Sequence, residues 1–373
     1  MLSSIFTPVT DPRVQGRTLY KLSDLLTCAL LTLLSNGVDF ADMEEFAKHR
    51  AKSFGLFEDC ESTPSHDTFR RMLGLVEPDE MMQCLCESGM KFLGTLAEKQ
   101  VIIDGKKLRG YSPRSQGTNG KYLLNAYVSE NHFVVGQQEL QDKENEIVAI
   151  PQLLDKINLE GAIVTIDAIG TQVNIAQKII NLMAHYLLAV KENQKALYEE
   201  VTDAFKLNNP ISEATEMNED HGRLEERTCR ILPAEVIEDK DITCRWANLT
   251  TIVEITSDVT IKATGETTRT KRYYISDEDF PKASYFNMLA RAHWEIENQL
   301  HWQLDVNFLE DDCRARTMNA AQNLSIVRKL ALQIAKDYKD SMTSKTKPSI
   351  RKLLFRASLN SDFLLEMFTN YKF

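Results

Sequence analysis

The sequence predicts an α/β protein in which helices flank a mixed β-sheet, with a β-strand insertion and an N-terminal helical domain. Two short apolar runs, 101–104 and 163–167, have the length and composition of buried strands, and they end in Asp104 and Asp167. Between residues 99 and 190, runs of this kind alternate with segments of helical periodicity. Residues 206–280 instead alternate Thr, Val and Ile with charged residues, which is typical of antiparallel strands with one face in water.

The first segment, from about residue 18 to residue 95, is predicted to be helical. Leucine and alanine recur at three- and four-residue spacing between Leu22 and Leu30. Ser65 is a cap-type residue before a second periodic run, and Arg70 and Arg71 lie near the start of that run. A helix of this kind suits either DNA reading or packing within a helical bundle, and the sequence does not decide between them.

The middle of the chain predicts the sheet. The expected elements are strands at 101–104, 122–128 and 133–140, a helix at 147–157, a strand at 163–167, a helix at 171–183 and a strand at 186–190. Right-handed crossovers would place the first and fourth of these strands side by side and parallel. Asp104 and Asp167 would then meet at the edge of the sheet where α/β proteins bind their ligands.

The chain becomes helical again from Tyr285 onward. We therefore divide it into five parts: an N-terminal helical, DNA-binding domain (1–97), the first part of the catalytic core (98–205), the strand insertion (206–280), the last part of the core (281–340) and a helical C-terminal tail (341–373).

Composition limits the class of protein. The 373 residues carry a net charge of −10, which argues against a protein that simply coats DNA. Residues 313–356, however, hold eleven Lys and Arg but only two Asp, so a local basic surface is expected there. No apolar run approaches the roughly 18 residues that span a bilayer. The seven cysteines lack metal-ligand spacing, which favours reduced thiols in a cytoplasm.

Two neighbouring carboxylates repel each other and therefore favour a bound cation. Oxygen ligands suit Mg²⁺ or Mn²⁺. A third acid is predicted at Glu297, which shares one helix face with His293 and His301. The alternatives are a helix-capping role for each aspartate and an exposed Glu297 paired with a histidine. A zinc site led by the two histidines is disfavoured, since they would lie roughly 12 Å apart along the helix.

Basic residues near these acids suit the handling of phosphate, because a phosphoryl transition state gathers negative charge. They are Lys106, Lys107, Arg109, Lys191, Arg314 and Arg316.

Five segments resemble the ISAs-type insertion-sequence transposases, a group that includes the H-repeat-associated proteins. These segments are Ile103–Gly110, Thr165–Ala168, Ala189–Gln194, His221–Glu225 and His293–Val306. The resemblance runs from about residue 10 to residue 340 and implies an RNase H-like DDE catalytic core. Its triad would be Asp104, Asp167 and Glu297. Where the wider group carries Tyr, Arg and Lys around the glutamate, this chain has Ala290, His293 and Leu304, so His293 would stand in for the arginine as a DNA contact.

The resemblance implies a bacterial transposase in the cytoplasm, associated with the nucleoid. Two Mg²⁺ or Mn²⁺ ions held by the triad would activate a water or a 3′-hydroxyl and stabilise the leaving 3′-oxygen. The partners would be double-stranded DNA, as terminal inverted repeats and target, and a second copy of the chain in a homodimer on DNA. Trp246 would either stack on an extruded base or belong to the core. The rival functions are an inactive, transposase-derived DNA-binding protein and a metal-dependent nuclease without strand transfer.

Overall fold

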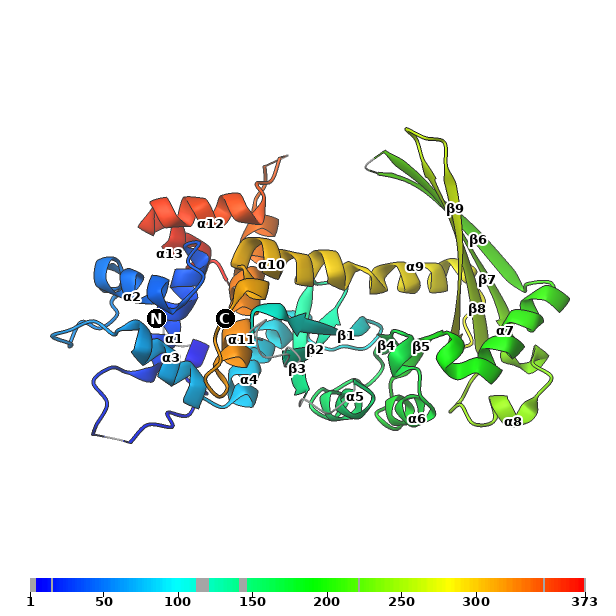
Figure 1. Cartoon of the computed structure of the whole chain (residues 1–373), viewed down its shortest axis with the longest axis horizontal. Helices are drawn as coiled ribbons and strands as arrows, with labels where there is room; N and C mark the ends of the chain where they lie inside the picture. Colours follow the sequence, from blue (N-terminus) through cyan, green and yellow to red (C-terminus); the bar gives the residue numbers. More distant parts are fainter. Residues whose placement is uncertain are drawn as a thin grey trace.

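The computed structural model describes residues 5–14, 16–111, 121–140, 146–220, 222–344 and 346–371. The molecule is elongated, with helices at one end, a sheet at the centre and long strands at the other end (Figure 1). His221 of the resemblance and Lys345 of the basic segment lie outside the described residues. Within these ranges, no helix is both long enough and apolar enough to cross a membrane.

The N-terminal part is helical, as predicted. Its main helices are α1 (Leu22–Leu34), α2 (Phe40–His49), α3 (His66–Leu75) and α4 (Pro78–Leu93). Helix α1 is apolar on nearly every side and is almost wholly buried. The long helix α11 (Ala320–Ser341) packs against α1, α3 and α4, and α12 (Ile350–Leu359) and α13 (Ser361–Thr369) pack against α11. The two ends of the chain therefore share one helical core, and the five-part division stays a prediction.

The central sheet confirms the predicted fold class. Its strands are β1 (Gln100–Leu108), β2 (Lys121–Val128), β3 (Phe133–Leu140), β4 (Ile163–Ile166) and β5 (His185–Val190). They lie in the order β3-β2-β1-β4-β5, with β1, β4 and β5 parallel to one another and β2 and β3 antiparallel. Helices α5 (Glu146–Asp155) and α6 (Val173–Asn181) supply the crossovers. The first and fourth predicted strands are thus parallel neighbours.

The strand insertion extends this sheet and does not form a second one. Strands β6 (Ser212–Asp220), β7 (Arg223–Pro233), β8 (Thr251–Ile261) and β9 (Thr267–Ser276) are antiparallel, and β9 pairs with β5 to give nine strands in all. Strand β6, which lacks an apolar run, was not predicted. Neither was helix α7 (Lys195–Leu207), which precedes β6, nor the short helix α8 (Lys240–Thr243) between β7 and β8. The far ends of these strands project from the molecule (Figure 1).

Helix α9 (Ala283–His293) crosses the sheet and contacts β4, β6, β7 and β8. Phe286, Leu289 and Ala290 of this helix join a buried cluster with Ile163 and Leu187 of the sheet. The chain continues through a π-helical turn (Glu297–His301) into α10 (Trp302–Phe308). The apolar contacts of α9 thereby bring Glu297 close to Asp104 in the middle of β1.

Candidate active site

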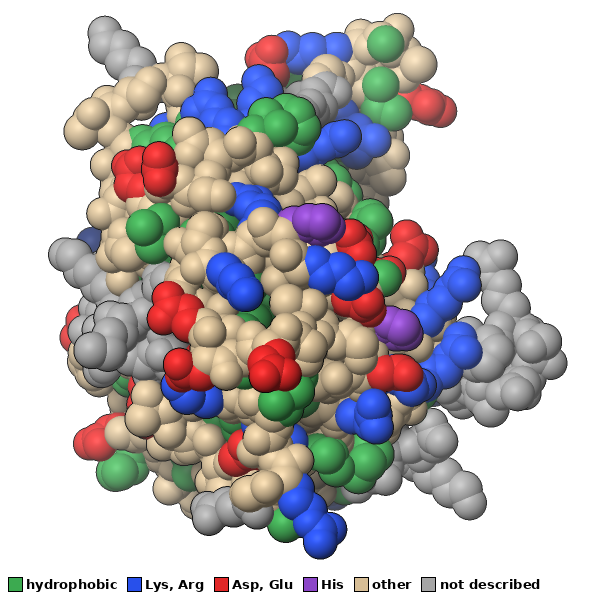
Figure 2. Space-filling view, turned by 90° about the vertical axis from the view of Figure 1, so that its left-hand side faces the viewer, with side chains coloured by type: hydrophobic (Ala, Val, Ile, Leu, Met, Phe, Trp, Pro, Cys, Tyr) green, Lys and Arg blue, Asp and Glu red, His purple; other side chains and the backbone are tan. Residues whose placement is uncertain are grey.

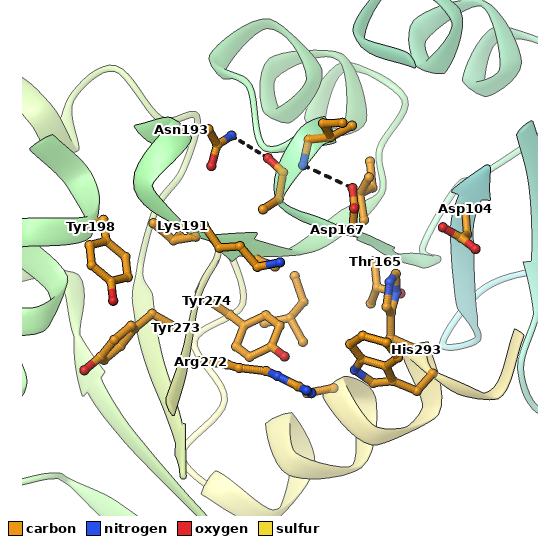
Figure 3. A pocket seen from close by; sticks show the side chains of 18 of the residues that line it. Asp104, Thr165, Asp167, Lys191, Asn193, Tyr198, Arg272, Tyr273, Tyr274 and His293 are labelled. Carbon is orange, nitrogen blue, oxygen red and sulfur yellow. Dashed lines mark hydrogen bonds between the residues drawn. The ribbon is translucent and has the colours of Figure 1, made fainter. Parts of the chain in front are cut away.

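Asp104 and Asp167 occupy matching positions on neighbouring strands. The parallel register pairs Ile103 with Ile166, and each aspartate is the next residue in its strand or just beyond it. Adjacent strands lie about 4.8 Å apart, so the two backbones are close at this level. Asp167 also caps the short turn that follows, because its Oδ1 accepts a hydrogen bond from the Ile169 amide at 3.1 Å (Figure 3). Capping occupies one oxygen and leaves the other oxygen of this carboxylate for another role.

Glu297 reaches Asp104 from the π-helical turn, together with His301. One ligand atom each from Asp104, Glu297 and His301 lies within 4.8 Å of the others. The His301 Nδ1 is 3.5 Å from Asp104 Oδ2 and 3.5 Å from Glu297 Oε2. π-Helical turns are often found at functional sites. His301 was placed on the same helix face as Glu297 from the sequence, and a pairing of Glu297 with a histidine was considered, but His301 was not included among the ligands of the acid site.

The electrostatics of this group suit a bound cation. Burial raises the pKa of Asp104 to about 6, with Glu297 and Asp167 adding to the rise and His301 opposing it. Hydrogen bonding to His301 is the main reason that the pKa of Glu297 is lowered. Asp104 Oδ2 is buried and has no hydrogen-bond partner among the described residues. A buried oxygen left without a donor, within a mainly carboxylate donor set, fits a divalent ion such as Mg²⁺ or Mn²⁺.

A fourth carboxylate, Glu146, lies near the two aspartates and was missed in the sequence. Burial raises its pKa to about 7, and the charges of Asp167 and Asp104 raise it further. An acid at the start of a predicted helix already has a plain explanation in the helix dipole, so its sequence position gave no signal.

Lys106, which was predicted to contact DNA, is buried and paired within the protein. It is only 8% exposed, and its ammonium pairs with Asp305 and, at 2.9 Å, with Glu310. Residues two apart on a strand share a face, so Lys106 lies on the same face of β1 as Asp104. Asp305 and Glu310, which follow Glu297 in the chain, cover it there. The charge of Lys106 is already paired within the fold, and its role in DNA binding stays a prediction.

His293, expected to stand in for an arginine as a DNA contact, lies against strand β4, and its role in DNA binding stays a prediction. Its Nδ1 lies 3.0 Å from the Thr165 hydroxyl. Burial lowers the pKa of His293 to about 4, which favours the neutral form of the ring. Hydrogen bonding to Thr165 instead ties this end of α9 to β4.

The remaining predicted phosphate contacts differ in exposure. Lys107 is half-buried, with its ammonium 5.4 Å from the centre of the Tyr122 ring, whereas Arg109 is exposed and 3.5 Å from Asp311. Arg314 and Arg316 are exposed. Their roles in DNA binding stay predictions.

The expected basic surface between residues 313 and 356 is only partly present. Arg328, Lys329 and Lys336 are buried in α11, between the sheet and the terminal helices. Figure 2 shows the helical end of the molecule, where Lys and Arg side chains are interspersed with Asp and Glu and form no continuous basic face. Charge counted along a sequence overstated this surface because α11 is a core helix.

A cavity of about 730 Å³ opens beside the acids. Asp104, Asp167 and Glu297 all line it, and Lys191 reaches it from the end of β5 (Figure 3). Its other wall carries Arg272, whose guanidinium lies 4.7 Å from the centre of the Trp294 ring.

Two features of this cavity were missed in the sequence: the Arg272 of β9 and Trp294, which is 49% exposed. Trp246, by contrast, is 4% exposed and belongs to the core, the second of the two roles considered for it.

Comparison with known proteins gives two family matches. The family described as Transposase DDE domain matches residues 96–334, and the family described as DDE_Tnp_1-associated matches residues 3–87. The chain is 34% identical over 369 residues to the Escherichia coli K12 protein YbfL, covering 95% of this chain and 94% of the relative.

A second E. coli K12 relative, named "H repeat-associated putative transposase YhhI", is 33% identical over 369 residues, with coverage of 95% and 94%. The solved piggyBac transposase synaptic complex with hairpin DNA aligns with a TM-score of 0.43 and 11% identity, covering 97% of this chain and 78% of that chain.

Proposed function

This chain belongs to the transposase DDE domain family, and we propose that it cleaves DNA at the ends of an insertion sequence and joins the freed strands to a target. The observation that carries this proposal is the meeting of Asp104 with Glu297. These two acids are 193 positions apart in sequence but lie within one 4.8 Å group. The remaining triad member, Asp167, lines the same cavity from the neighbouring strand.

The carboxylates would hold two divalent ions, Mg²⁺ or Mn²⁺. Bound there, the ions would supply activation of the attacking oxygen and stabilisation of the leaving 3′-oxygen. Asp104 would be the shared acid, since it is close to Glu297 and lies on β1 at the level of Asp167 on the neighbouring strand. Its burial excludes water from one side of the site and strengthens its attraction for a cation.

The cavity beside the acids would receive the DNA strand. Lys191 and Arg272 present cations to the phosphates, and the exposed Trp294 presents a flat apolar face. Aromatic rings of this kind stack on bases without sequence preference. The helices of the N-terminal and C-terminal parts would bind the element ends, and a homodimer on DNA would bring two ends together.

The test supplies linear DNA carrying the inverted repeats that flank the gene, together with Mg²⁺ or Mn²⁺. We expect 3′ ends to be released and then joined to a second DNA, and we expect both products to be lost in Asp104→Asn and Glu297→Gln. Asp155→Asn, which alters an acid at the far end of α5, is the matched control and should retain both products.

Two other outcomes would each favour one of the rival functions. Specific binding to the repeats without cleavage by the unmutated protein would favour an inactive DNA-binding protein. Cleavage that depends on the triad but never joins ends to a target would favour a nuclease.

A further inference from the structure

The three acids of the proposed triad come from three elements that meet on one face of the sheet. Residues two apart on a strand point to the same side, so Gln100 and Asp104 share a face of β1. The parallel register of β1 and β4 places Thr165 and Asp167 on that face as well. Helix α9, which leads to Glu297, packs against this face. The distance from Glu297 to the aspartates therefore depends on how α9 is seated on the sheet.

Apolar packing alone would not fix this seating closely. Helix α9 meets the sheet through Phe286, Leu289 and Ala290, and apolar contact has no preferred direction. A small slide or rotation of the helix would keep most of the buried area and still move Glu297. Metal ligands, however, must be placed to within roughly 0.2 Å. A more directional contact between α9 and the strands is therefore needed.

A polar bridge of Gln100, Thr165 and His293 supplies such contacts within this apolar interface. Gln100 and Thr165 are each 2% exposed. The Gln100 Nε2 donates to the Thr165 hydroxyl at 3.0 Å and to the backbone carbonyl of Leu289 in α9 at 2.8 Å. One turn further along α9, the His293 Nδ1 lies 3.0 Å from the same hydroxyl (Figure 3). The bridge therefore joins β1, β4 and two successive turns of α9.

The donors and acceptors of the polar bridge match in one arrangement. The Gln100 amide has two N–H groups, and each finds an acceptor. Because the Thr165 oxygen accepts from Gln100, its own proton is available to the His293 Nδ1. A neutral imidazole, which the lowered pKa of His293 favours, can accept that proton. Fully matched buried polar groups specify a single packing arrangement more sharply than apolar contacts do.

The polar bridge lies close to two of the acids. Thr165 precedes Asp167 by two residues, which is about 7 Å along an extended strand. His293 precedes Glu297 by four residues, or about 6 Å along a helix. The hydrogen bond between Thr165 and His293 is therefore a direct link, one step from the acids, between the strand that carries Asp167 and the helix that leads to Glu297.

We propose that Gln100, Thr165 and His293 are positioning residues, which seat α9 on the sheet so that Glu297 stands at the separation from the aspartates that divalent ions require. This inference rests on the proposed function, since it concerns the geometry of the same metal centre. The three residues would act through the acids and would not themselves bind metal.

The test measures Mn²⁺ binding to the full chain by titration with EPR detection. Thr165→Val keeps the shape of the side chain and removes the hydroxyl that both Gln100 and His293 contact. Without this link α9 can shift on the sheet, and we expect Mn²⁺ affinity to fall by about 10-fold or more. Thr165→Ser retains the hydroxyl and should bind Mn²⁺ within about 3-fold of the unmutated protein.

Thr251→Val is the matched control for the loss of a buried hydroxyl. Thr251 lies on β8, is 4% exposed, and donates from its hydroxyl to the Glu278 carbonyl at 2.7 Å. Both valine variants should unfold at a lower urea concentration in EDTA, since each loses a buried hydrogen bond. Only Thr165→Val should also lose Mn²⁺ affinity. A Thr165→Val protein that is less stable but binds Mn²⁺ with full affinity would show a purely structural role and overturn the inference.

The outcomes also separate this inference from the proposed function. If the unmutated protein binds no more Mn²⁺ than Asp104→Asn does, the metal centre itself is absent and both proposals fail. If it binds Mn²⁺ and Thr165→Val binds equally well, only the positioning role is overturned. Should Thr165→Val fail to fold, Gln100→Met removes the two donated hydrogen bonds on a side chain of similar length. The inference then requires Gln100→Met to fold with weakened Mn²⁺ binding and is overturned if its affinity is unchanged.

Discussion

Asp104 and Lys106 lie on one face of β1, and each belongs to a cluster of charged residues. The two clusters differ in how their charges are balanced. The acidic cluster (Asp104, Asp167, Glu146 and Glu297) contains no lysine or arginine in contact with its carboxylates among the described residues. The paired cluster (Lys106, Asp305, Glu310 and Lys329) is neutral in sum and more deeply buried. The same strand therefore carries one cluster whose charges are balanced within the protein and one whose negative charges are not.

The paired cluster shows what a completed site looks like. Glu310 is 1% exposed; Lys106 donates to its Oε2 at 2.9 Å, and the Ser325 hydroxyl donates to its Oε1 at 2.7 Å. Burial alone would raise the pKa of Glu310, but Lys106 and Lys329 outweigh it and bring the pKa to about 2. Lys329 in turn donates to Asn125 and Gln137 of the sheet. Each of these buried groups therefore has a hydrogen-bond partner within the fold.

The acidic cluster and the paired cluster differ in the source of their counter-charge. The paired cluster obtains it from lysines of the chain and so ties β1 to α10 and α11. The acidic cluster has a raised pKa at Asp104 and a buried oxygen without a donor, so its counter-charge must come from protons or bound cations. Variants at Asp104 and Lys106 should therefore have opposite effects.

The largest effect is expected on catalysis from Asp104→Asn. Loss of an acid that would hold both divalent ions should lower strand cleavage by about 10³-fold or more. In EDTA the variant should be at least as stable as the unmutated protein, because a buried charge is removed. Cleavage assays on inverted-repeat DNA, run beside denaturant unfolding, check both halves. A variant that loses activity only because it is less stable would contradict the comparison.

The next effect is on stability, from Lys106→Met. Removing this cation leaves Glu310 buried without its main partner, which typically costs about 3–5 kcal/mol. Urea unfolding of the metal-free protein measures the loss. Lys107→Met is the matched control on the same strand. Its ammonium lies over an aromatic ring and in no ion pair among the described residues, so about 1 kcal/mol or less is expected. Equal losses would show that the paired cluster does not stabilise the fold.

The sequence predicted the acidic cluster better than the paired cluster. Asp104 and Asp167 were found because each ends an apolar run, and the pairing of parallel strands brings such ends together. Glu297 was found from helical spacing. The burial of Lys106 depends on Asp305 and Glu310, about 200 positions later, and no local pattern records that contact.

Other failures have the same origin. Lys329 and Lys336 looked like surface charge because their helix is polar in composition, yet tertiary packing encloses it from several sides. Strand β6 lacks an apolar face and is recognised only by its pairing with β7. The pairing of His301 with Glu297 follows from their four-residue spacing, but helical periodicity does not predict the π-helical turn that contains both residues.

A third effect concerns pH, and its sign differs between the clusters. The pKa of Asp104 rises from 3.8 to about 6 on folding, so the folded state binds the proton more tightly and stability is lost as pH rises through this range. Glu310 has a lowered pKa of about 2, so its contribution is present above pH 4.5 and is lost as pH falls. We therefore expect Asp104→Asn to gain on the order of 1–3 kcal/mol over the unmutated protein between pH 4.5 and pH 7 in EDTA. A difference in unfolding free energy that does not change with pH would contradict the assignment.

The smallest expected effect concerns whether His301 is a metal ligand of the acidic cluster. The His301 Nδ1 lies 3.5 Å from two of its carboxylates, whereas the His293 Nδ1 is engaged by Thr165. If His301 is a ligand, Mn²⁺ bound to the protein should show nitrogen coupling in pulsed EPR spectra. His301→Gln should abolish this coupling and weaken one Mn²⁺ by about 10-fold. His293→Gln alters a histidine two turns earlier and should preserve the coupling. Coupling that survives in His301→Gln would leave the cluster purely carboxylate and would assign the imidazole to orienting Glu297.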